Sequence, residues 1–339
     1  MAGSPIGNVG SYKYGFVVGA GANREDLLDQ ITNVDPWDTP WVTQAPKVGA
    51  NHTYHEWLKD TLGSIDASGA QEGADYAIDS STAPTREFNI TMILRKDIGV
   101  SETQRYLNPA GFKDAYAYEI QKATKLLAIK LEKAVLQSVT SSTGNSASAR
   151  QMKSLQSFIV TNTAYSGVLG GAVTGAAATA GTLTAKDFNK MLRTIYNAGG
   201  NPEQVYASPA VKQMISNFTV SSQNRNIAAV DRKLINALDF YDSDFGLIQI
   251  VIDRWVPEAT ATATAGASQS DVSGRLFFLQ RSMNRLAWLR PMNHFLVGKR
   301  GDSVAGIVVG EVTLEVLSEK ANGMLVSVSN LNAALNVDA

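Results

Sequence analysis

Two histidines and a glutamate lie close together in residues 51–60, NHTYHEWLKD, and their side chains are of the kind that binds metal ions. A zinc site of the H-E-x-x-H type places its histidines at positions i and i+4 of one helix, with the glutamate between them. Here His52 and His55 are three residues apart, and Glu56 lies outside the pair. The local pattern is typical of a β-strand, on which the two histidines would point to opposite faces. We therefore expect a strand here and no metal site.

Other short strings that resemble catalytic motifs lack the context that the chemistry needs. GAGAN at residues 19–23 has neither the third glycine nor the preceding buried strand of a dinucleotide-binding turn. DFG at 244–246 comes without the other kinase motifs and indicates a turn into a strand, and RGD at 300–302 also indicates a turn. His294 has no nucleophile or acid next to it in the sequence. The sequence predicts no enzyme, no cofactor and no metal.

Composition limits the remaining classes of protein. The chain has 339 residues, 44% of them hydrophobic, which is enough for two ordinary domains or one elaborated domain. The chain has 30 Lys and Arg residues and 31 Asp and Glu residues, so its net charge gives no indication of nucleic-acid binding. There is no cysteine, which fits a protein made in a reducing cytosol. Neither a secretory signal nor a stretch of roughly 20 apolar residues is present, so we expect a soluble protein.

Residues 1–50 are irregular and rich in Gly, Asn and Pro, yet they contain Trp37 and Trp41. Large aromatic side chains in such a segment need another surface on which to be buried. That surface is either the chain's own domain or a neighbouring subunit.

Residues 52–58 and 86–95 read as two strands joined by a long polar connection, and so as an extended hairpin. Apolar and polar residues alternate along the second strand. Phe88, Ile90 and Met92 would lie on one face, with Glu87, Asn89 and Thr91 on the other. A lone hairpin is marginal in water, so this one also requires a partner surface.

The clearest helix is expected at about 108–140, with Asn108 and Pro109 as start signals. One apolar stripe follows the helical period and contains Tyr116, Ile120, Ala123, Leu127, Leu131 and Ala134. Residues 141–183 are rich in Ser, Thr, Gly and Ala and read as a loop or flexible insertion.

An α/β region follows. Thr184 with Asp187 predicts a helix N-terminus, and Gly199-Gly200 its end. Ser208-Pro209 predicts the start of a second helix. Strands are expected at EQVYAS, FGLIQIVID and RLFFLQ. Near the end, Val312, Leu314 and Val316 alternate with polar residues along a long strand, and Asn322-Gly323 predicts a hairpin with MLVSV as the return strand.

Three long segments in the same order resemble the major capsid proteins of tailed double-stranded DNA bacteriophages. Residues 35–62, DPWDTPWVTQAPKVGANHTYHEWLKDTL, resemble the end of an N-terminal arm and the ascending strand of an extended loop. Residues 183–216, beginning LTAKDFNKMLRTIYNAGG, resemble the start of an axial domain, and residues 277–325 resemble the segment that returns to the peripheral domain. The similarity is weakest in 1–30 and 141–183.

The resemblance implies an α+β phage capsid fold of the Hong Kong ninety-seven type. Its parts would be an N-terminal arm, an extended β-hairpin loop, a peripheral domain with a long spine helix at about 108–140, and an axial α/β domain. The implied boundaries are 1–50 for the arm, 51–98 for the extended loop, 99–183 and 290–339 for the peripheral domain, and 184–289 for the axial domain.

The resemblance also implies the function: a structural subunit that self-assembles into the pentamers and hexamers of an icosahedral head enclosing the phage genome. The expected location is the virion, after assembly in the host bacterial cytoplasm. Expected partners are other copies of the chain, portal, a separate scaffolding protein, decoration proteins and, without specificity, packaged DNA, but no membrane. Aromatic residues of the arm and hairpin are the candidates for inter-subunit contact: Trp37, Trp41, Tyr54, Trp57 and Phe88.

Three other classes stay open. A shell protein of a non-viral encapsulating compartment with the same fold ranks second, and a cargo-peptide groove would distinguish it. A hydrolase or transferase in residues 184–290 would need a pocket with convergent titratable groups. A fibre or adhesin subunit would form an elongated trimer instead of a closed shell.

Overall fold

The computed structural model describes the greater part of the chain between residues 35 and 328. The described residues are 35–62, 67, 69, 71–73, 75, 83–107, 114–137, 140–165, 183–221, 239–260, 272–299 and 301–328. Residues 1–34 of the expected arm and most of the connection of the expected hairpin lie outside this part.

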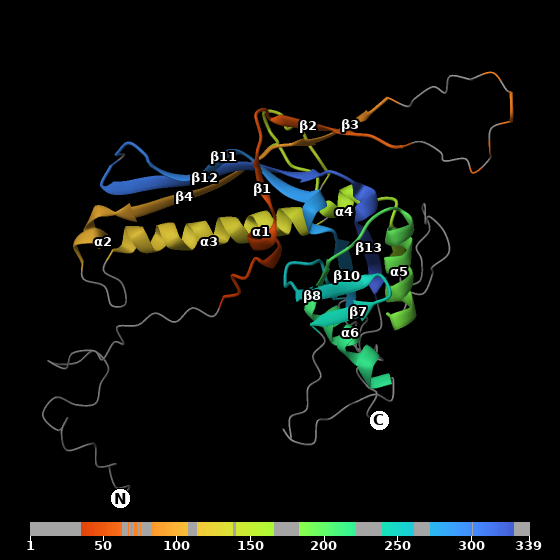
Figure 1. Cartoon of the computed structure of the whole chain (residues 1–339). Helices are drawn as coiled ribbons and strands as arrows, with labels where there is room; N and C mark the ends of the chain where they lie inside the picture. Colours follow the sequence, from red (N-terminus) through yellow and green to blue (C-terminus); the bar gives the residue numbers. More distant parts are fainter. Residues whose placement is uncertain are drawn as a thin grey trace, which may run out of the picture.

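One unit of the fold is a four-stranded sheet in the order β1-β11-β12-β4. Its strands are β1 (Lys47–Gly49), β4 (Met92–Ser101), β11 (Asn284–Leu296) and β12 (Ser303–Val316). β12 pairs antiparallel with both β11 and β4, whereas the short β1 adds to β11 in parallel. The helix α3 (Ala115–Leu136) runs lengthwise beneath this sheet (Figure 1).

The long helix is confirmed, but it begins later than the sequence indicated. The carboxylate of Asp114 accepts a hydrogen bond from the amide of Tyr116 and caps the first turn, so Asn108 is not the cap. α3 has 22 residues, and residues 108–113 before it are not described. Its buried face keeps most of the predicted stripe and adds a charged residue: Ala115, Tyr116, Ala123, Leu127, Leu131, Glu132, Val135 and Leu136. A short helix α2 (Glu102–Tyr106) precedes it.

A second unit is a seven-stranded sheet in the order β5-β13-β10-β6-β8-β7, with β9 (Ala259–Thr260) paired to β10. The other strands are β5 (Thr163–Tyr165), β6 (Gln204–Ala207), β7 (Phe240–Ser243), β8 (Gly246–Ile252), β10 (Val272–Leu279) and β13 (Gly323–Val328). α5 (Ala185–Asn197) and α6 (Pro209–Ser221) pack on it through their apolar faces. The expected strands of this region are all confirmed, and the DFG string is the turn between β7 and β8.

Local signals set the helix ends of this unit as predicted. The hydroxyl of Thr184 accepts from the amide of Asp187, and the Asp187 carboxylate accepts from the amide of Thr184, which completes a capping box. Gly199 has a φ of +91°, a left-handed conformation that glycine adopts without strain, and there α5 ends. Pro209 is the first residue of α6.

The expected hairpin at Asn322-Gly323 is wrong. After β12 the chain forms a short 3-10 helix η3 (Glu319–Ala321) and enters the other sheet, where β13 pairs with β10 and β5. The Asn322 side chain is buried and exchanges hydrogen bonds with the Asn284 side chain, at 2.8 and 3.1 Å. Its polar atoms are thereby engaged in tertiary contacts, and no tight turn forms.

The expected loop at 141–183 is partly wrong as well. Residues 140–165 contain the helix α4 (Leu155–Phe158), the strand β5 and an isolated bridge between Ser142 and Gln151. Four of their apolar side chains are at most 4% exposed: Met152, Leu155, Phe158 and Ile159. Apolar residues scattered among small polar ones therefore form part of the core, while residues 166–182 lie outside the described part.

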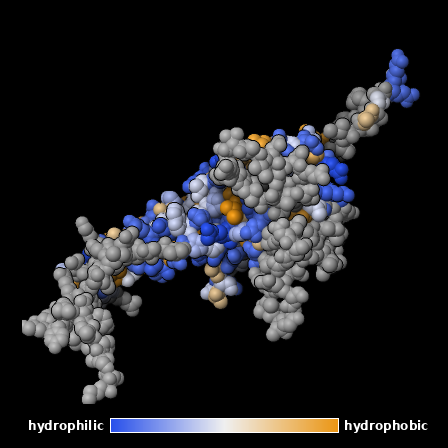
Figure 2. Space-filling view, turned by 90° about the horizontal axis from the view of Figure 1, so that it is seen from below, coloured by the Kyte–Doolittle hydropathy of each residue, from blue (hydrophilic) through white to orange (hydrophobic). Residues whose placement is uncertain are grey.

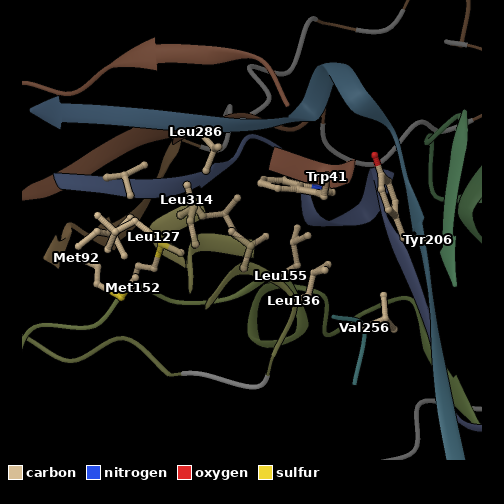
Figure 3. Close-up of a cluster of buried hydrophobic side chains, with 14 of the residues drawn as sticks. Trp41, Met92, Leu127, Leu136, Met152, Leu155, Tyr206, Val256, Leu286 and Leu314 are labelled. Atoms are coloured by element: carbon tan, nitrogen blue, oxygen red, sulfur yellow. The ribbon is translucent and has the colours of Figure 1, made fainter. Parts of the chain in front are cut away.

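The main core lies between α3 and the four-stranded sheet and continues to the second sheet. Figure 3 shows Leu127 of α3 with Leu286 and Leu314 of the sheet, and Leu136 of α3 nearer to Trp41 and Tyr206 in the same cluster. One shared core holds the two sheets together. The helix α1 (Pro40–Gln44), which contains Trp41, packs at the junction.

Candidate intersubunit site

The hairpin predicted from the sequence is present and is formed by β2 (Tyr54–Lys59) and β3 (Thr85–Ile90). It lies above the four-stranded sheet and points away from it (Figure 1). On its outer face the rings of Tyr54 and Phe88 stack with centroids 4.5 Å apart, and both side chains are exposed. Leu58 is exposed on the same face, beside an ion pair between Arg86 and Glu56. This outer face is an amphipathic surface without a cover within the described residues.

The inner face of the hairpin packs on its own subunit. The Trp57 ring is buried and contacts Phe158 of α4, with ring centroids 6.0 Å apart. The His55 Nε2 atom lies 3.2 Å from a carboxylate oxygen of Glu315 on β12. His52 precedes the strand, and its Nδ1 accepts from the amide of Tyr54. The two histidines thus have separate structural contacts.

A buried asparagine fixes the base of the hairpin. The Asn89 side-chain amide donates to the backbone carbonyls of Leu314 and Lys153, at 2.7 and 3.1 Å. Its oxygen accepts from the amides of Lys153 and Ile90, at 2.7 and 2.8 Å. Asn89 therefore connects β3 to β12 and to residues 140–165 at once. The strict alternation expected here ends at Thr91, where the chain bends into β4 and polar side chains turn inward.

A buried carboxylate lies next to this anchor. Glu311 on β12 is 3% exposed and accepts from the Thr91 hydroxyl at 2.6 Å. Its two oxygens also pair with Arg150 at 2.7 Å and Arg290 at 3.1 Å. A buried carboxylate is stabilised when several donors satisfy its oxygens, as they do here. The network joins the hairpin base, residues 140–165 and both long strands.

The arm is held by a second buried carboxylate. Glu132 of α3 has 0% exposure and accepts from the backbone amides of Trp41 and Val42, both at 2.8 Å. The indole of Trp255 donates to the carbonyl of Asp38, and Arg281 donates to the carbonyl of Gln44. The arm segment 38–44 is thus bonded to α3 and to the second sheet.

Glu132 and Asp253 form a tightly coupled acid pair beneath this segment. Burial, followed by the negative charge of Asp253, raises the pKa of Glu132 to about 9. Burial also raises the pKa of Asp253. No local sequence pattern indicates this pair, because Glu132 lies in the charged string KLEK and is 121 positions from Asp253.

The five predicted contact residues separate into two groups. Trp37 is 61% exposed beneath the ammonium of Lys125, and Tyr54 and Phe88 are exposed on the hairpin. Trp41 and Trp57 are 3% and 9% exposed, because each ring is buried in the chain's own core. Of the two surfaces left open for the arm, Trp41 therefore lies on the chain's own domain, and Trp57 of the hairpin is buried there as well. The described surface seen from below is mainly hydrophilic with small hydrophobic areas (Figure 2).

Within the described residues, no three His, Asp or Glu side chains come together as a metal-binding group. A shallow hollow on the second unit is lined by Lys186, Asn189, Lys190, Arg193, Asp244 and Phe245, a set without a His or a hydroxyl nucleophile. No helix in the described part is long and apolar enough to cross a membrane.

The arrangement of arm, projecting hairpin, long helix beneath one sheet and second α/β sheet defines a class of protein: it is the phage capsid fold of the Hong Kong ninety-seven type. A chain of the cyanophage A-1(L) capsid superposes with a TM-score of 0.62 at 14% identity, covering 90% of this chain and 97% of that one. A chain from the capsid of a native GTA particle gives 0.57 at 13% identity, covering 96% and 99%. The holo-SrpI encapsulin complex of Synechococcus elongatus PCC 7942 gives 0.54 at 11% identity, covering 91% and 92%.

Sequence comparison then identifies the family. Residues 11–329 match the model of the SU10 major capsid protein, and the chain belongs to that family. The major capsid protein of Escherichia phage Phieco32 is 34% identical over 107 residues, which are 31% of this chain. That match spans 30% of the relative's own length. The resemblance inferred from the three sequence segments is confirmed.

Proposed function

We propose that this chain is the shell-forming subunit of a phage head, and that it assembles with copies of itself into pentamers and hexamers. The observation that carries the proposal is the length of the family match, since residues 11–329 include the arm, the hairpin, the long helix and both sheets. Membership of a capsid protein family supports a structural role.

The geometry of the hairpin supports self-assembly. Its inner face is anchored by Asn89 and Trp57, so its direction is fixed by the subunit that carries it. Its outer face presents Tyr54, Phe88 and Leu58 to solvent. A hairpin that touches a different surface on the next copy makes a heterologous contact, and such contacts close into rings when the rotation permits. Tyr54 and Phe88 are therefore the aromatic residues that we assign to the contact, together with Trp37.

We assign the domains by sheet, which moves β5 and β13 from the expected peripheral domain into the second unit. The four-stranded sheet with α3 would be the peripheral domain, with α3 as its spine helix, and the seven-stranded sheet with α5 and α6 would be the axial domain around the five-fold and six-fold axes. Portal, scaffolding and decoration proteins and packaged DNA are the proposed partners, with the virion as the location and the host bacterial cytoplasm as the place of assembly.

The test is negative-stain electron microscopy with sedimentation velocity on the purified chain, expressed alone and with its neighbouring genes. Closed shells, or isolated pentamers and hexamers, are expected. A monodisperse monomer or small dimer under all conditions would overturn the proposal.

The second candidate is a shell protein of a non-viral compartment, which the likeness to the SrpI encapsulin complex favours. The two proposals predict different contents inside the shell. Shells isolated with nucleic acid inside favour the phage head, whereas shells that retain one folded cargo protein through a short peptide favour the compartment.

A further inference from the structure

The acid pair of Glu132 and Asp253 lies where three parts of the chain meet. Glu132 belongs to α3, Asp253 directly follows β8, and the arm helix α1 packs at the same junction. The two carboxyls are 0% and 1% exposed. Their position means that whatever changes the charge of the pair acts on all three parts.

Each oxygen of Glu132 already accepts a hydrogen bond from the arm. Oε1 accepts from the amide of Trp41 and Oε2 from the amide of Val42, each at 2.8 Å. Thr39, at the start of α1, makes no side-chain cap, so Glu132 satisfies amides that the arm cannot satisfy itself. This bidentate contact connects the arm to α3.

Only one of the two carboxylate oxygens of Asp253 accepts a hydrogen bond from the described residues. Its Oδ1 accepts from the amide of Trp255 at 2.8 Å, whereas Oδ2 is buried and has no donor in the described part of the chain. The negative charge of Asp253 contributes to the raised pKa of Glu132, so the two carboxyls lie close together in the buried junction. Two carboxylates cannot donate to each other, so the contact requires one proton between them. That proton also satisfies the orphaned Oδ2.

The neighbouring charged groups have other partners. The ammonium of Lys133 lies 4.4 Å from the Trp255 ring centroid, Arg281 donates to the Gln44 carbonyl, and Arg254 pairs with Asp38. Tyr206 faces the pair from β6, and its hydroxyl donates to the Gln204 side chain. The nearby cations therefore do not replace the proton.

We propose that the proton shared by Glu132 and Asp253 is a lock that fixes the arm segment 38–44 to α3 and to the end of β8. With the proton present, the pair carries one negative charge that the two arm amides stabilise. Without it, two buried carboxylates repel each other, Asp253 loses its partner, and the arm detaches. The lock does not depend on the proposed function.

The direction of the pH effect follows from burial. Burial raises the pKa of both acids above their unfolded values. The stabilisation is therefore complete at low pH and is lost as pH rises through the raised pKa, which lies above neutrality. Between the ordinary pKa of a glutamate and the raised pKa of about 9 for Glu132, attachment weakens about tenfold for each pH unit, because each opening releases one proton; above that value the pH dependence levels off.

The test is hydrogen–deuterium exchange of the full chain at pH 7 to 10, corrected for intrinsic exchange rates. The readout is the protection of the Trp41 and Val42 amides, with α5 amides as the reference for global unfolding. We expect the arm amides of the wild type to lose protection with a slope near tenfold per pH unit up to about pH 9, where the slope levels off, while α5 keeps its protection. Asp253→Asn, whose amide can donate to Glu132 at every pH, should show no such slope.

Two controls keep the result interpretable. Glu132→Gln removes the titrating proton and also one of the two acceptors for the arm amides, so it should lower arm protection at every pH and lack the slope. Glu311→Gln alters a matched buried carboxylate elsewhere, and the arm amides of this variant should keep the wild-type slope. Infrared spectra should show a carboxylic acid band that disappears above neutral pH in the wild type. The proposal would be overturned by an equal slope in the wild type and Asp253→Asn, or by a loss of α5 amide protection at the same pH as the arm amides.

Discussion

The side-chain amide of Asn89 donates to the backbone carbonyl of Leu314 at 2.7 Å, and this one contact fixes the base of the hairpin to the longest strand of the sheet. Asn89 is 0% exposed, so water cannot take the place of the bond. Replacing it removes four hydrogen bonds and leaves buried backbone groups of Leu314 and Lys153 without a partner.

We expect Asn89→Ala to lower the free energy of unfolding by at least about 2 kcal/mol, because each unsatisfied buried group costs about 1–3 kcal/mol. Urea denaturation followed by far-UV circular dichroism measures the change. The control is Asn145→Ala, which removes an exposed asparagine bonded only to its own loop and should have little effect. Equal stability of the two variants would show that the anchor does not hold the hairpin.

The two arginines that pair with Glu311 should contribute unequally. Arg150 lies 2.7 Å from the carboxylate with its side chain 27% exposed, and Arg290 lies 3.1 Å away with 54% exposed. Water screens the more exposed pair more strongly.

Double-mutant cycles built on Glu311→Gln with Arg150→Gln or Arg290→Gln should therefore give a larger coupling free energy for Arg150, of about 1–2 kcal/mol. The cycles are measured by chemical denaturation. A larger coupling to Arg290 would contradict this assignment.

Gly306 on β12 has no room for a side chain. A Cβ atom there would lie 1.9 Å from the Tyr116 hydroxyl and 2.6 Å from the His294 ring, and these two groups are hydrogen-bonded to each other at 2.8 Å. Gly306→Ala should cost about 1–3 kcal/mol of stability by overpacking.

The neighbouring strand offers the matched control for this change. Gly99 of β4 would place a Cβ in open space, so Gly99→Ala should be close to neutral. Removing the hydroxyl with Tyr116→Phe should recover part of the loss in Gly306→Ala. No recovery would mean that the tyrosine hydroxyl is not the obstacle. Thermal unfolding of the wild type, Gly306→Ala, Gly99→Ala and the double variant Gly306→Ala/Tyr116→Phe decides between these outcomes.

The stacked pair of Tyr54 and Phe88 should matter for assembly more than for folding. The double variant Tyr54→Ala/Phe88→Ala loses an exposed ring contact worth roughly 1 kcal/mol within the subunit. If the pair is buried between subunits, as proposed, an aromatic contact of about 2 kcal/mol corresponds to roughly 30-fold weaker association per contact.

Sedimentation velocity and electron microscopy of the assembled fraction measure this effect. Tyr196→Ala is the comparison, since Tyr196 is also exposed and lies against another ring, that of Phe245, away from the hairpin. Shells formed at wild-type yield by the hairpin double variant would remove Tyr54 and Phe88 from the proposed interface.

Signals confined to a few neighbouring residues predicted the local structure well. The Thr184 capping box, the left-handed Gly199 and the start of α6 at Pro209 depend on backbone groups within one turn, and all are confirmed. The pairing of β2 with β3 was also predicted, because two alternating segments need each other.

Features that depend on distant partners were not predictable in this way. Glu132 looks like any charged helix residue until Trp41 and Asp253 are placed beside it. Asn89 looks like the polar side of a strand, yet its partners are at Lys153 and Leu314. Asn322-Gly323 has the composition of a hairpin turn, and only the pairing of Asn322 with Asn284 reveals another role.

The place of β13 has a consequence for the order in which the protein can fold during synthesis. In the second sheet, β13 lies between β5 and β10, so residues 323–328 fill a position flanked by strands made much earlier. Domains generally fold as the ribosome delivers them, from the N-terminal side first. Here β5 at residues 163–165 has no neighbour to pair with until residue 323 emerges. The nascent chain therefore cannot complete this sheet until residues 323–328 have left the ribosome, long after β5 was made.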